Sequence, residues 1–460
     1  MDKGVDAAWV VVAALLVMFM QAGFAMLEVG FSRMKNVGTV VAKVLTNFGV
    51  ASIVYWAAGF GVAFGGAAAW LFPLIGDSGF APSFSPGSTM NLPAMAASGA
   101  PAAAKFLFQL MFCAVSLAIV WGTMLERTKF IVHVLFAIPF AGFIYPLISH
   151  QLFGGGFLQT TLGAQDFAGS TVVHLTGAVA GLAGLLLLGP RIGKYERGRP
   201  NVIPGHSMPL AQLGVLILWF GWFGFNAGST LNATGLHFAD VAVTTQLAAA
   251  AGAVAALAVS YLTTRTLDVG MVGNGAIAAL VGITAPSGYV EPWAAIVIGA
   301  VAGVIVVVAI PIIDRRLDDP VGCLSAHGLA GVWGTLACGL FTAPALARFN
   351  GVGRGGLFYT GSLHQLGAQA AAVAMSGGCV FALSYAAFWA IDRTVGLRVG
   401  AHEEVEGLDI SEHGMWGYPE SFMPVPGGVY RPASHPTVNR EAPASPGSVE
   451  AQRDVEIEPA

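Results

Sequence analysis

The sequence predicts an all-α membrane protein, and three observations lead to that fold class. Only 10% of the 460 residues are charged and 55% are hydrophobic, whereas soluble domains carry about 25% charged residues. Apolar stretches of about 20 residues, the length needed to cross a bilayer core, recur along the chain. The 61 glycines suit this class, because small residues let transmembrane helices approach closely. The net charge of −4 gives no indication of a nucleic acid partner.

Apolar runs separated by charged residues or by Gly, Pro and Asn predict eleven transmembrane helices. The start of the chain is interpreted as the first span and not as a signal peptide, because its apolar stretch is too long and lacks a small-residue cleavage site. The spans are expected near residues 8–29, 41–65, 104–125, 130–149, 167–189, 209–231, 241–262, 270–286, 292–313, 322–342 and 367–391.

The basic residues predict the orientation, because cytoplasmic loops collect Lys and Arg. With the N-terminus outside, the inside loops hold 13 basic residues and the outside segments hold four, so the C-terminus is expected inside. The inside residues are Arg33, Lys35, Arg127, Lys129, Arg191, Lys194, Arg197, Arg199, Arg265, Arg315, Arg316, Arg393 and Arg398, and the outside residues are Lys3, Lys105, Arg348 and Arg354.

Composition divides the chain into three parts. Residues 1–391 are expected to form the transmembrane domain, and residues 392–420 a polar, amphiphilic stretch on the inner side. Residues 421–460 are rich in proline and poor in apolar residues, so we expect this tail to be disordered.

Two histidines within the apolar spans indicate an internal repeat. His174 opens HLTGAVAGLAG and His327 opens HGLAGVWG, each followed by small residues at helical spacing. Five spans separate the two, and an odd number reverses the helix direction. The sequence therefore predicts a 5+5 inverted repeat, with halves near 8–189 and 209–342 and an eleventh helix at 367–391. Inverted repeats in transporters place the substrate path at the interface between the halves, near the bilayer midplane.

The expected depth of the two histidines supports a functional interpretation. At about 1.5 Å per residue, His174 lies roughly 12 Å beyond Asp166, and His327 lies roughly 10 Å beyond Pro320 from the opposite side. An ionisable residue at such depth is by default a functional candidate. The alternative is that each histidine only hydrogen-bonds a neighbouring backbone group. His133 has no equivalent in the repeat and is interpreted as structural.

Several motifs resemble the Amt branch of the ammonium transporter (Amt/Rh) family. The resemblance covers about residues 7 to 420 and follows the family's order of motifs. The motifs are MQAGFAMLEVG (20–30), KN (35–36), QLMF (109–112), DFAGSTVVH (166–174), GWFGFNAGS (221–229), DDPVGCLSAHG (318–328) and GLRV…EGLD…HG (396–414).

The resemblance implies a fold of eleven helices in a homotrimer, with one pore through each subunit. It implies that His174 and His327 line a narrow hydrophobic pore, and that Phe112 and Phe225 gate it from outside. A vestibule that recruits ammonium is implied to contain Phe112, Phe153, Ser229, Trp222 and Asp166. Phe153 departs from the family, which often carries tryptophan at this position. Since indole is the best cation–π face, weaker binding of the cation is expected here.

The mechanism that the resemblance implies begins with deprotonation of ammonium near the gate. Ammonia then passes the histidines, with or without a separate proton relay along the imidazole pair. Asp166 has two interpretations that can hold together, a helix N-cap and a negative charge that favours a cation above the pore.

The resemblance also implies the setting in which the protein works. It indicates a multi-pass protein of the cell (plasma) membrane, and residues 392–420 resemble a cytoplasmic regulatory region that a PII-type protein can bind. No cofactor is expected. Two alternatives stay open, an ammonium sensor with little flux and a secondary transporter of another small amine. An enzyme is not expected, because no nucleophile–base pair or metal motif occurs in the spans.

Overall fold

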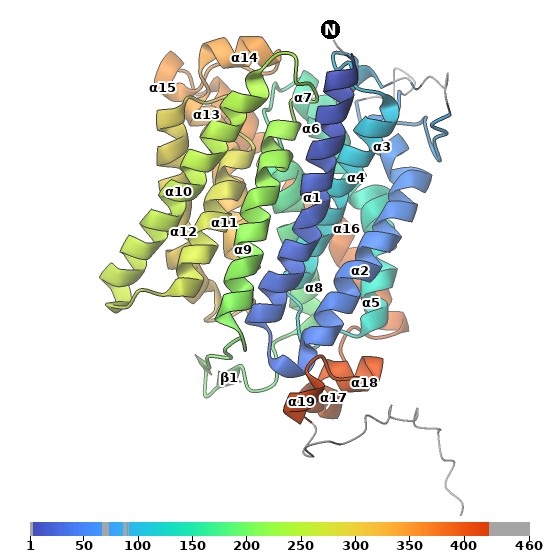
Figure 1. Ribbon diagram of the computed structural model, residues 1–460, viewed down its shortest axis with the longest axis vertical. Coiled ribbons are helices and arrows are strands. Elements are labelled where there is room, and N and C mark those ends of the chain that lie inside the picture. Colours follow the sequence, from blue (N-terminus) through green and yellow to red (C-terminus); the bar gives the residue numbers. More distant parts are fainter. Residues whose placement is uncertain (1–2, 67–72, 86–89, 91, 423–460) are drawn as a thin grey trace, which may run out of the picture.

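The spans fold into one bundle of long helices that cross the molecule from end to end (Figure 1). The structure is a computed structural model, and it describes residues 3–66, 73–85, 90 and 92–422. The predicted tail 421–460 therefore lies outside the described residues, except for its first two residues. The N-terminus lies at one end of the bundle and the last described helices lie at the other, and we call these the N-terminal end and the C-terminal end.

Ten helical segments of the described chain are long and apolar enough to cross a membrane. They are Lys3–Phe31, Met34–Phe64, Ala102–Gly122, Phe130–Thr160, Ser170–Leu188, Met208–Ala227, His237–Thr264, Pro292–Ile313, Leu324–Phe341 and His364–Thr394. The remaining predicted span corresponds to the shorter apolar helix α11 (Val269–Thr284), which has 16 residues. All eleven predicted ranges thus coincide with apolar helices, which confirms the all-α membrane class.

Several helices are longer than their predicted spans. The helix predicted at 41–65 begins at Met34, and the one predicted at 367–391 runs from His364 to Thr394. The predictions followed hydropathy, whereas helical hydrogen bonding continues into the polar residues that flank the apolar run. The exact ends of the spans were therefore not predictable from composition.

The helical segments are built from shorter pieces. The α-helices of the first half are α1 (Lys3–Phe31), α2 (Val37–Val54), α3 (Phe60–Phe64), α4 (Ala102–Gly122), α5 (Phe130–Pro139), α6 (Tyr145–Leu152), α7 (Phe157–Thr160) and α8 (Thr176–Leu188). Those of the second half are α9 (Met208–Trp222), α10 (His237–Thr264), α11, α12 (Pro292–Ile313), α13 (Ala330–Phe341), α14 (Pro344–Asn350), α15 (Leu357–Thr360), α16 (His364–Thr394), α17 (Ala401–Glu406), α18 (Leu408–His413) and α19 (Pro419–Phe422).

Five π-helical turns interrupt the long helices, and two short 3₁₀ turns accompany them in the described chain. The π turns are η2 (Tyr55–Gly59), η4 (Phe140–Ile144), η5 (Ser170–Leu175), η6 (Phe223–Ala227) and η7 (Leu324–Leu329), and the 3₁₀ turns are η1 (Met34–Asn36) and η3 (Pro93–Met95). A π turn inserts an extra residue and is frequent at functional sites. Three of the five contain or adjoin predicted site residues, namely His174, His327 and Phe225.

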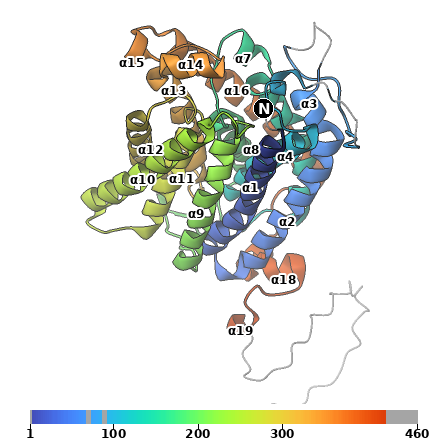
Figure 2. The same ribbon diagram turned by 45° about the horizontal axis from the view of Figure 1, so that its top comes forward.

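The helices pack closely through small residues. A side chain at Gly214 of α9 would overlap the backbone of Leu27 in α1, and one at Gly30 of α1 would overlap the backbone of Ala211 in α9. This close approach is the arrangement that small residues allow in membrane helices. It fixes α1 beside α9, as Figure 2 also shows.

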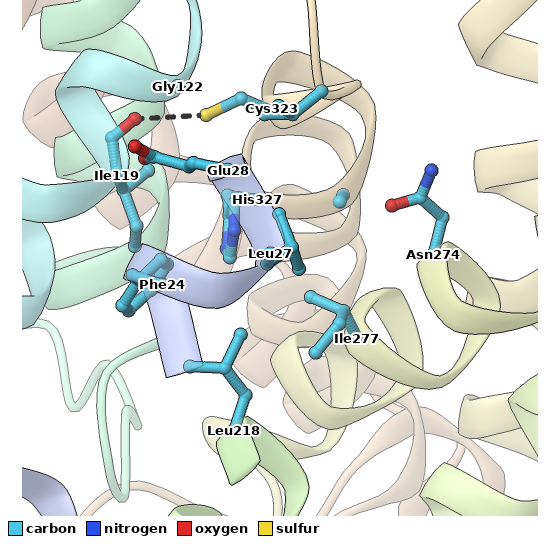
Figure 3. A pocket seen from close by; sticks show the side chains of 12 residues that line it. Phe24, Leu27, Glu28, Ile119, Gly122, Leu218, Asn274, Ile277, Cys323 and His327 are labelled. Atoms are coloured by element: carbon cyan, nitrogen blue, oxygen red, sulfur yellow. Dashed lines mark hydrogen bonds between the residues drawn. The ribbon is translucent and has the colours of Figure 1, made fainter. Parts of the chain in front are cut away.

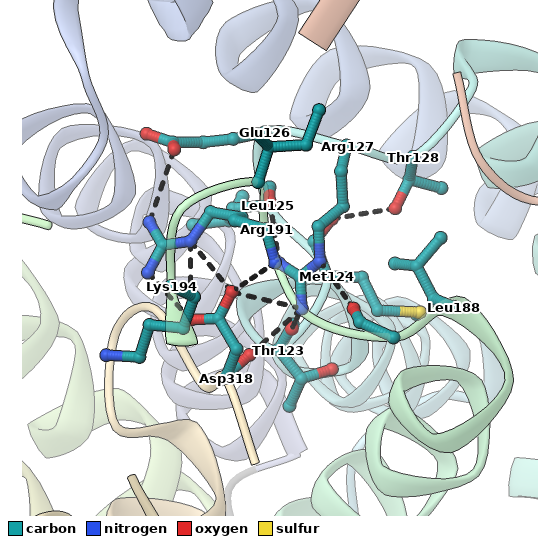
Figure 4. A network of polar contacts seen from close by, with 12 residues as sticks. Thr123, Met124, Leu125, Glu126, Arg127, Thr128, Leu188, Arg191, Lys194 and Asp318 are labelled. Atoms are coloured by element: carbon teal, nitrogen blue, oxygen red, sulfur yellow. Dashed lines mark hydrogen bonds and ion pairs between the residues drawn. The ribbon is translucent and has the colours of Figure 1, made fainter. Parts of the chain in front are cut away.

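A buried network of charged residues ties the loops together at the C-terminal end (Figure 4). Arg191 forms ion pairs with Asp318 at 2.8 Å and with Glu126 at 3.2 Å, and Arg33 contacts Glu126 at 2.7 Å. Arg127 donates a hydrogen bond to the Asp318 carbonyl at 2.9 Å. A hairpin of β1 (Tyr195–Glu196) and β2 (Arg199–Pro200) lies at the same end.

Candidate functional site

A hollow of about 170 Å³ opens at the N-terminal end of the bundle. Its wall includes four of the predicted site residues, Phe112, Phe153, Asp166 and Ser229. Asp166 is the one charged side chain among the described residues that line it. Polar groups, aromatic faces and a single carboxylate thus share one small space, which suits a small cation that donates hydrogen bonds.

Ser229 follows the π turn η6 and presents its hydroxyl oxygen as an acceptor. The hydroxyl donates its own hydrogen to the Phe225 carbonyl at 2.9 Å. Since a hydroxyl carries one donor and two lone pairs, the oxygen keeps the capacity to accept from a ligand. Ser229 therefore suits a ligand that donates.

Asp166 forms the cap of the helix that carries His174. Its two carboxylate oxygens accept four backbone N–H groups, from Gly169 at 2.7 Å and from Ser170, Thr171 and Val172 at 2.9 Å. These are the N–H groups that a helix start leaves without partners. The side chain is 5% exposed, so the capping role is present while its charge stays close to the hollow.

Two stacked phenylalanines close the floor of the hollow. The ring centroids of Phe112 and Phe225 lie 4.0 Å apart with planes at 13°. Both side chains are buried, at 1% and 0% exposure. Phe153 meets Phe112 edge-on at 6.5 Å, on the side of the hollow. Because the two rings are in contact, a hydrated ion cannot pass between them. A molecule that passes this point requires the rings to move.

Behind the phenylalanines, the two predicted histidines are in contact. Nδ1 of His174 lies 3.2 Å from Nδ1 of His327, and the rings are stacked with centroids 5.3 Å apart. Only one of the two nitrogens can carry the shared hydrogen, so one ring donates through Nδ1 and the other accepts there. The ring centroids of Phe225 and His174 lie 5.5 Å apart. The rings of Phe112, Phe225, His174 and His327 thus form one continuous row.

The histidines come from helices that start at opposite ends of the bundle. His174 lies in η5, which begins just after Asp166 at the hollow. His327 lies in η7, which begins just after Asp318 in the charged network of the C-terminal end. The structure therefore confirms that the two rings meet in the interior from opposite directions. Their role in a pore stays a prediction.

The structure places Trp222 differently from the prediction. It is not among the residues that line the hollow but lies stacked against His174, with ring centroids 5.2 Å apart. Its Nε1 donates to the Thr284 hydroxyl at 2.9 Å, so the indole is fully engaged. The π turn η6 follows α9 directly, and its extra residue changes the direction in which the later side chains point. Ser229 therefore lies on a different side of the helical segment from Trp222. Trp222 thus packs on His174 and is not one of the described residues that line the hollow.

Other residues of the site were not singled out from the sequence. Gln109, Tyr289 and Asn350 also line the hollow, although Gln109 belongs to the quoted motif QLMF. Glu28 and Lys43 form an ion pair within two of the membrane-length helices, and both are 2% exposed. The signal for this pair was present, since each is a charged residue inside or beside an apolar run.

Comparison with known proteins identifies the relatives of this chain. A model of the ammonium transporter family matches residues 8–418. The ammonium transporter Amt2 of Archaeoglobus fulgidus is 42% identical over 428 residues, which covers 90% of this chain and 88% of the relative. The ammonium transporter Amt1 of Haloferax mediterranei is 38% identical over 451 residues, which covers 91% of this chain and 80% of the relative.

Solved structures with the same fold come from similar proteins. A sensor Amt protein superposes with a TM-score of 0.80 at 34% identity, covering 89% of this chain and 98% of that one. The crystal structure of Mep2 from Candida albicans superposes with a TM-score of 0.79 at 29% identity, covering 91% of each chain.

Proposed function

The chain belongs to the ammonium transporter family, and from that premise we propose that it carries ammonium across a membrane. The observation that supports this function is the contact between His174 and His327 behind the stacked pair Phe112 and Phe225. This arrangement offers a narrow route with ring nitrogens at mid-depth and no room for a hydrated ion. The protein acts as a transporter and not as an enzyme.

Ammonium is recruited in the N-terminal hollow, which faces the outside of the cell. Ser229 accepts one of its hydrogen bonds, while Phe112 and Phe153 offer aromatic faces worth about 0.5–2 kcal/mol each. The charge of Asp166 adds a negative potential, even though its oxygens are occupied by backbone N–H groups. These contacts concentrate the cation but discriminate weakly, because K⁺ also interacts with an aromatic face.

Selectivity arises at the dry passage beyond the phenylalanines. A monovalent cation without its water faces a formal cost of tens of kcal/mol in a low-dielectric channel. Ammonium can lose its proton and continue as neutral ammonia, whereas K⁺ has no such route. The histidine pair receives the proton and passes it on separately, since each imidazole offers one donor and one acceptor nitrogen.

The same proposal assigns the parts of the chain and its setting. Residues 1–391 form the transmembrane domain, built as a 5+5 inverted repeat with an eleventh helix. The protein assembles as a homotrimer in the plasma membrane, with the N-terminus outside and the C-terminus inside. Residues 392–420 form a cytoplasmic regulatory region that suits a PII-type partner, because α18 lies at the C-terminal end against α2 (Figure 2).

A second candidate is an ammonium sensor with little flux, and one observation favours it. A similar solved structure is named a sensor Amt protein, and this chain covers 98% of it. A secondary transporter of another small amine is disfavoured, because it would need a larger midplane cavity, whereas the phenylalanine rings and the histidine rings are in contact.

The deciding experiment measures current and uptake in proteoliposomes after an ammonium jump. Wild type is expected to take up ammonium and to give a current, with no response to an equal K⁺ jump. His174→Ala is expected to lose the current by about tenfold or more, or to admit K⁺. A wild type that binds ammonium without uptake would contradict the transporter and support the sensor.

A further inference from the structure

One buried pair of charges is not used by the recruitment or by the histidine contact. Glu28 of α1 and Lys43 of α2 form an ion pair with both side chains almost fully enclosed. No other hydrogen-bond partner is present for Glu28 Oε2 or Lys43 Nζ among the described residues. Charged groups inside membrane helices are costly and usually mark a path for ions or protons.

Glu28 and His327 line the same small cavity (Figure 3). Phe24 lies one helical turn before Glu28 on the same face of α1, and its ring centroid is 6.3 Å from that of His327. Because side chains four residues apart stack along one face of a helix, Glu28 lies about 6 Å further along α1 than Phe24, which packs on His327.

The cavity suits a single water molecule. Its volume is about 20 Å³, and a buried water molecule needs roughly 10–15 Å³ and two to four polar partners. Three residues with polar side chains, Glu28, His327 and Asn274, line its wall. Cys323 also lines it, but its thiol already donates to the Ile119 carbonyl at 3.1 Å.

The cavity lies between the histidine pair and the C-terminal end of the bundle. Glu28 is three residues before α1 ends at Phe31, and Gly122, where α4 ends, also lines the cavity. His327 uses Nδ1 for His174 and is left with Nε2 for the cavity. The order of groups is therefore His174, His327, cavity and Glu28, with the helix ends just beyond.

We propose that Glu28 is the proton acceptor on the inner side of His327 and that Lys43 positions it. This inference rests on the proposed function and assigns a residue to the exit of the proton. The N–H bond at Nε2 of His327 breaks as the proton bonds to the cavity water, and that water gives one of its protons to the Glu28 carboxylate. The water is regenerated, His327 is neutral, and Glu28 becomes a carboxylic acid.

The acid then releases its proton beyond the end of α1. Ammonia that leaves the pore takes up this proton and becomes ammonium again, so one ammonium ion is balanced on each side. Lys43 remains an ammonium group throughout and favours the ionised carboxylate, which prevents Glu28 from retaining the proton. Without Lys43 the buried carboxylate would favour its protonated form, and the relay would stop there.

A purely structural ion pair is the rival explanation, and a matched set of variants separates the two. Glu28→Gln removes the acid but leaves Lys43 as an unpaired buried ion, so it can fail through misfolding alone. The double variant Glu28→Gln with Lys43→Met removes both charges, and such neutral replacements of a buried ion pair usually fold well. Glu28→Asp keeps the acid with a shorter side chain.

The experiment records ammonium-jump current and ¹⁵N-ammonium uptake from the same proteoliposomes. The double variant is expected to elute as the wild-type assembly and to lose current per ammonium taken up by about tenfold or more. Glu28→Asp is expected to retain a larger share of the current than Glu28→Gln. If the double variant restores current to within about twofold of wild type, the pair is structural and the proposal is wrong.

The uptake and the current of the wild-type protein show which of the two proposals fails, the proton acceptor at Glu28 or the proposed function. Uptake of ammonium without any current would leave the transporter in place but overturn a proton acceptor at Glu28. Absence of uptake would overturn the proposed function itself, and with it the need for a proton exit. Should the double variant not fold, equal currents in Glu28→Asp and Glu28→Gln would overturn the inference.

Discussion

Asp166 and Asp319 hold equivalent places before the two facing histidines. Each lies eight residues before its histidine and three residues before a glycine with positive φ, Gly169 at 117° and Gly322 at 72°. Asp166 accepts from four backbone N–H groups, and Asp319 accepts from the Leu324 N–H at 2.7 Å. The segments that lead to His174 and to His327 therefore have the same local structure, a turn at a glycine capped by an aspartate and then a π turn. The two segments run through the bundle in opposite directions.

The two caps differ in strength, which gives a first prediction. Asp166→Asn replaces a carboxylate that accepts four N–H groups by an amide with one acceptor oxygen, whereas Asp319→Asn can keep the bond to Leu324. Since hydrogen bonds to charged groups contribute about 1.5–3 kcal/mol, Asp166→Asn should lower the free energy of unfolding by about 2 kcal/mol more than Asp319→Asn. Chemical unfolding in detergent micelles measures both, and equal losses would contradict the difference.

Phe153 gives a second prediction, about affinity. Phe153→Trp should lower the half-saturating ammonium concentration by about two- to fivefold, because indole is a stronger cation–π face and exposed contacts of this kind contribute about 0.5–1 kcal/mol. Phe153→Leu, which removes the aromatic face, should raise that concentration. Current as a function of ammonium concentration provides the measurement, and the same value for all three proteins would exclude Phe153 from recruitment.

Much of this architecture followed from the sequence, for reasons that are physical. Long apolar runs must form helices in a membrane because each backbone polar group needs an internal partner. The contact of His174 with His327 followed from their depth and from the reversal between halves. The repeat of Asp, Gly and His in DFAGSTVVH and DPVGCLSAH was equally visible in the sequence but was not used.

The remaining features depend on tertiary packing. Trp222 lies against His174 because α9 passes into the π turn η6, and an extra residue in the turn changes which side chains share a face. Spacing along a regular helix cannot show that shift. Glu28 and Lys43 lie 15 positions apart on separate helices, so their pairing depends on how α1 and α2 align, which hydropathy does not encode.

The charged network at the C-terminal end predicts a loss of stability in acid. Burial raises the pKa of Glu126, but Arg191 and Arg33 outweigh it and lower the pKa below its usual value. Burial likewise raises the pKa of Asp318, and Arg191 and Arg127 lower it overall. A carboxyl group with a lowered folded pKa stabilises the fold above its unfolded pKa and loses that contribution as pH falls through the folded value.

The measurement follows thermal unfolding from pH 7 downward. The stabilisation by Glu126 and Asp318 should be present in full at pH 7 and should decrease below about pH 4.5 as these two carboxylates become protonated. Glu126→Gln should be less stable at pH 7 and should show a smaller decrease below pH 4.5. Glu196→Gln serves as the control, because the Glu196 side chain is exposed and forms no ion pair with the described residues. An identical acid profile for Glu126→Gln and wild type would contradict this role of the network.

The last prediction concerns the attachment of the C-terminal helices to the bundle. The Asp409 carboxylate in α18 accepts the N–H groups of Gly38 and Thr39 at 2.9 Å, and it thereby caps the start of α2. The side chain is fully buried. Asp409→Ala leaves these N–H groups without a partner, and loss of an N-cap costs about 0.5–2 kcal/mol.

Because Asp409 joins two elements, its loss should act on both of them. Hydrogen exchange should become faster in residues 401–414 and in the first turn of α2, while the other long helices keep their protection. Glu412→Gln changes a charge on the same helix without touching these bonds, so its exchange should match wild type. Faster exchange throughout the bundle in Asp409→Ala would indicate a general loss of stability, whereas unchanged exchange would show that other contacts hold α18. The selective pattern is expected because an N-cap stabilises the turn that it contacts and has little effect several turns away.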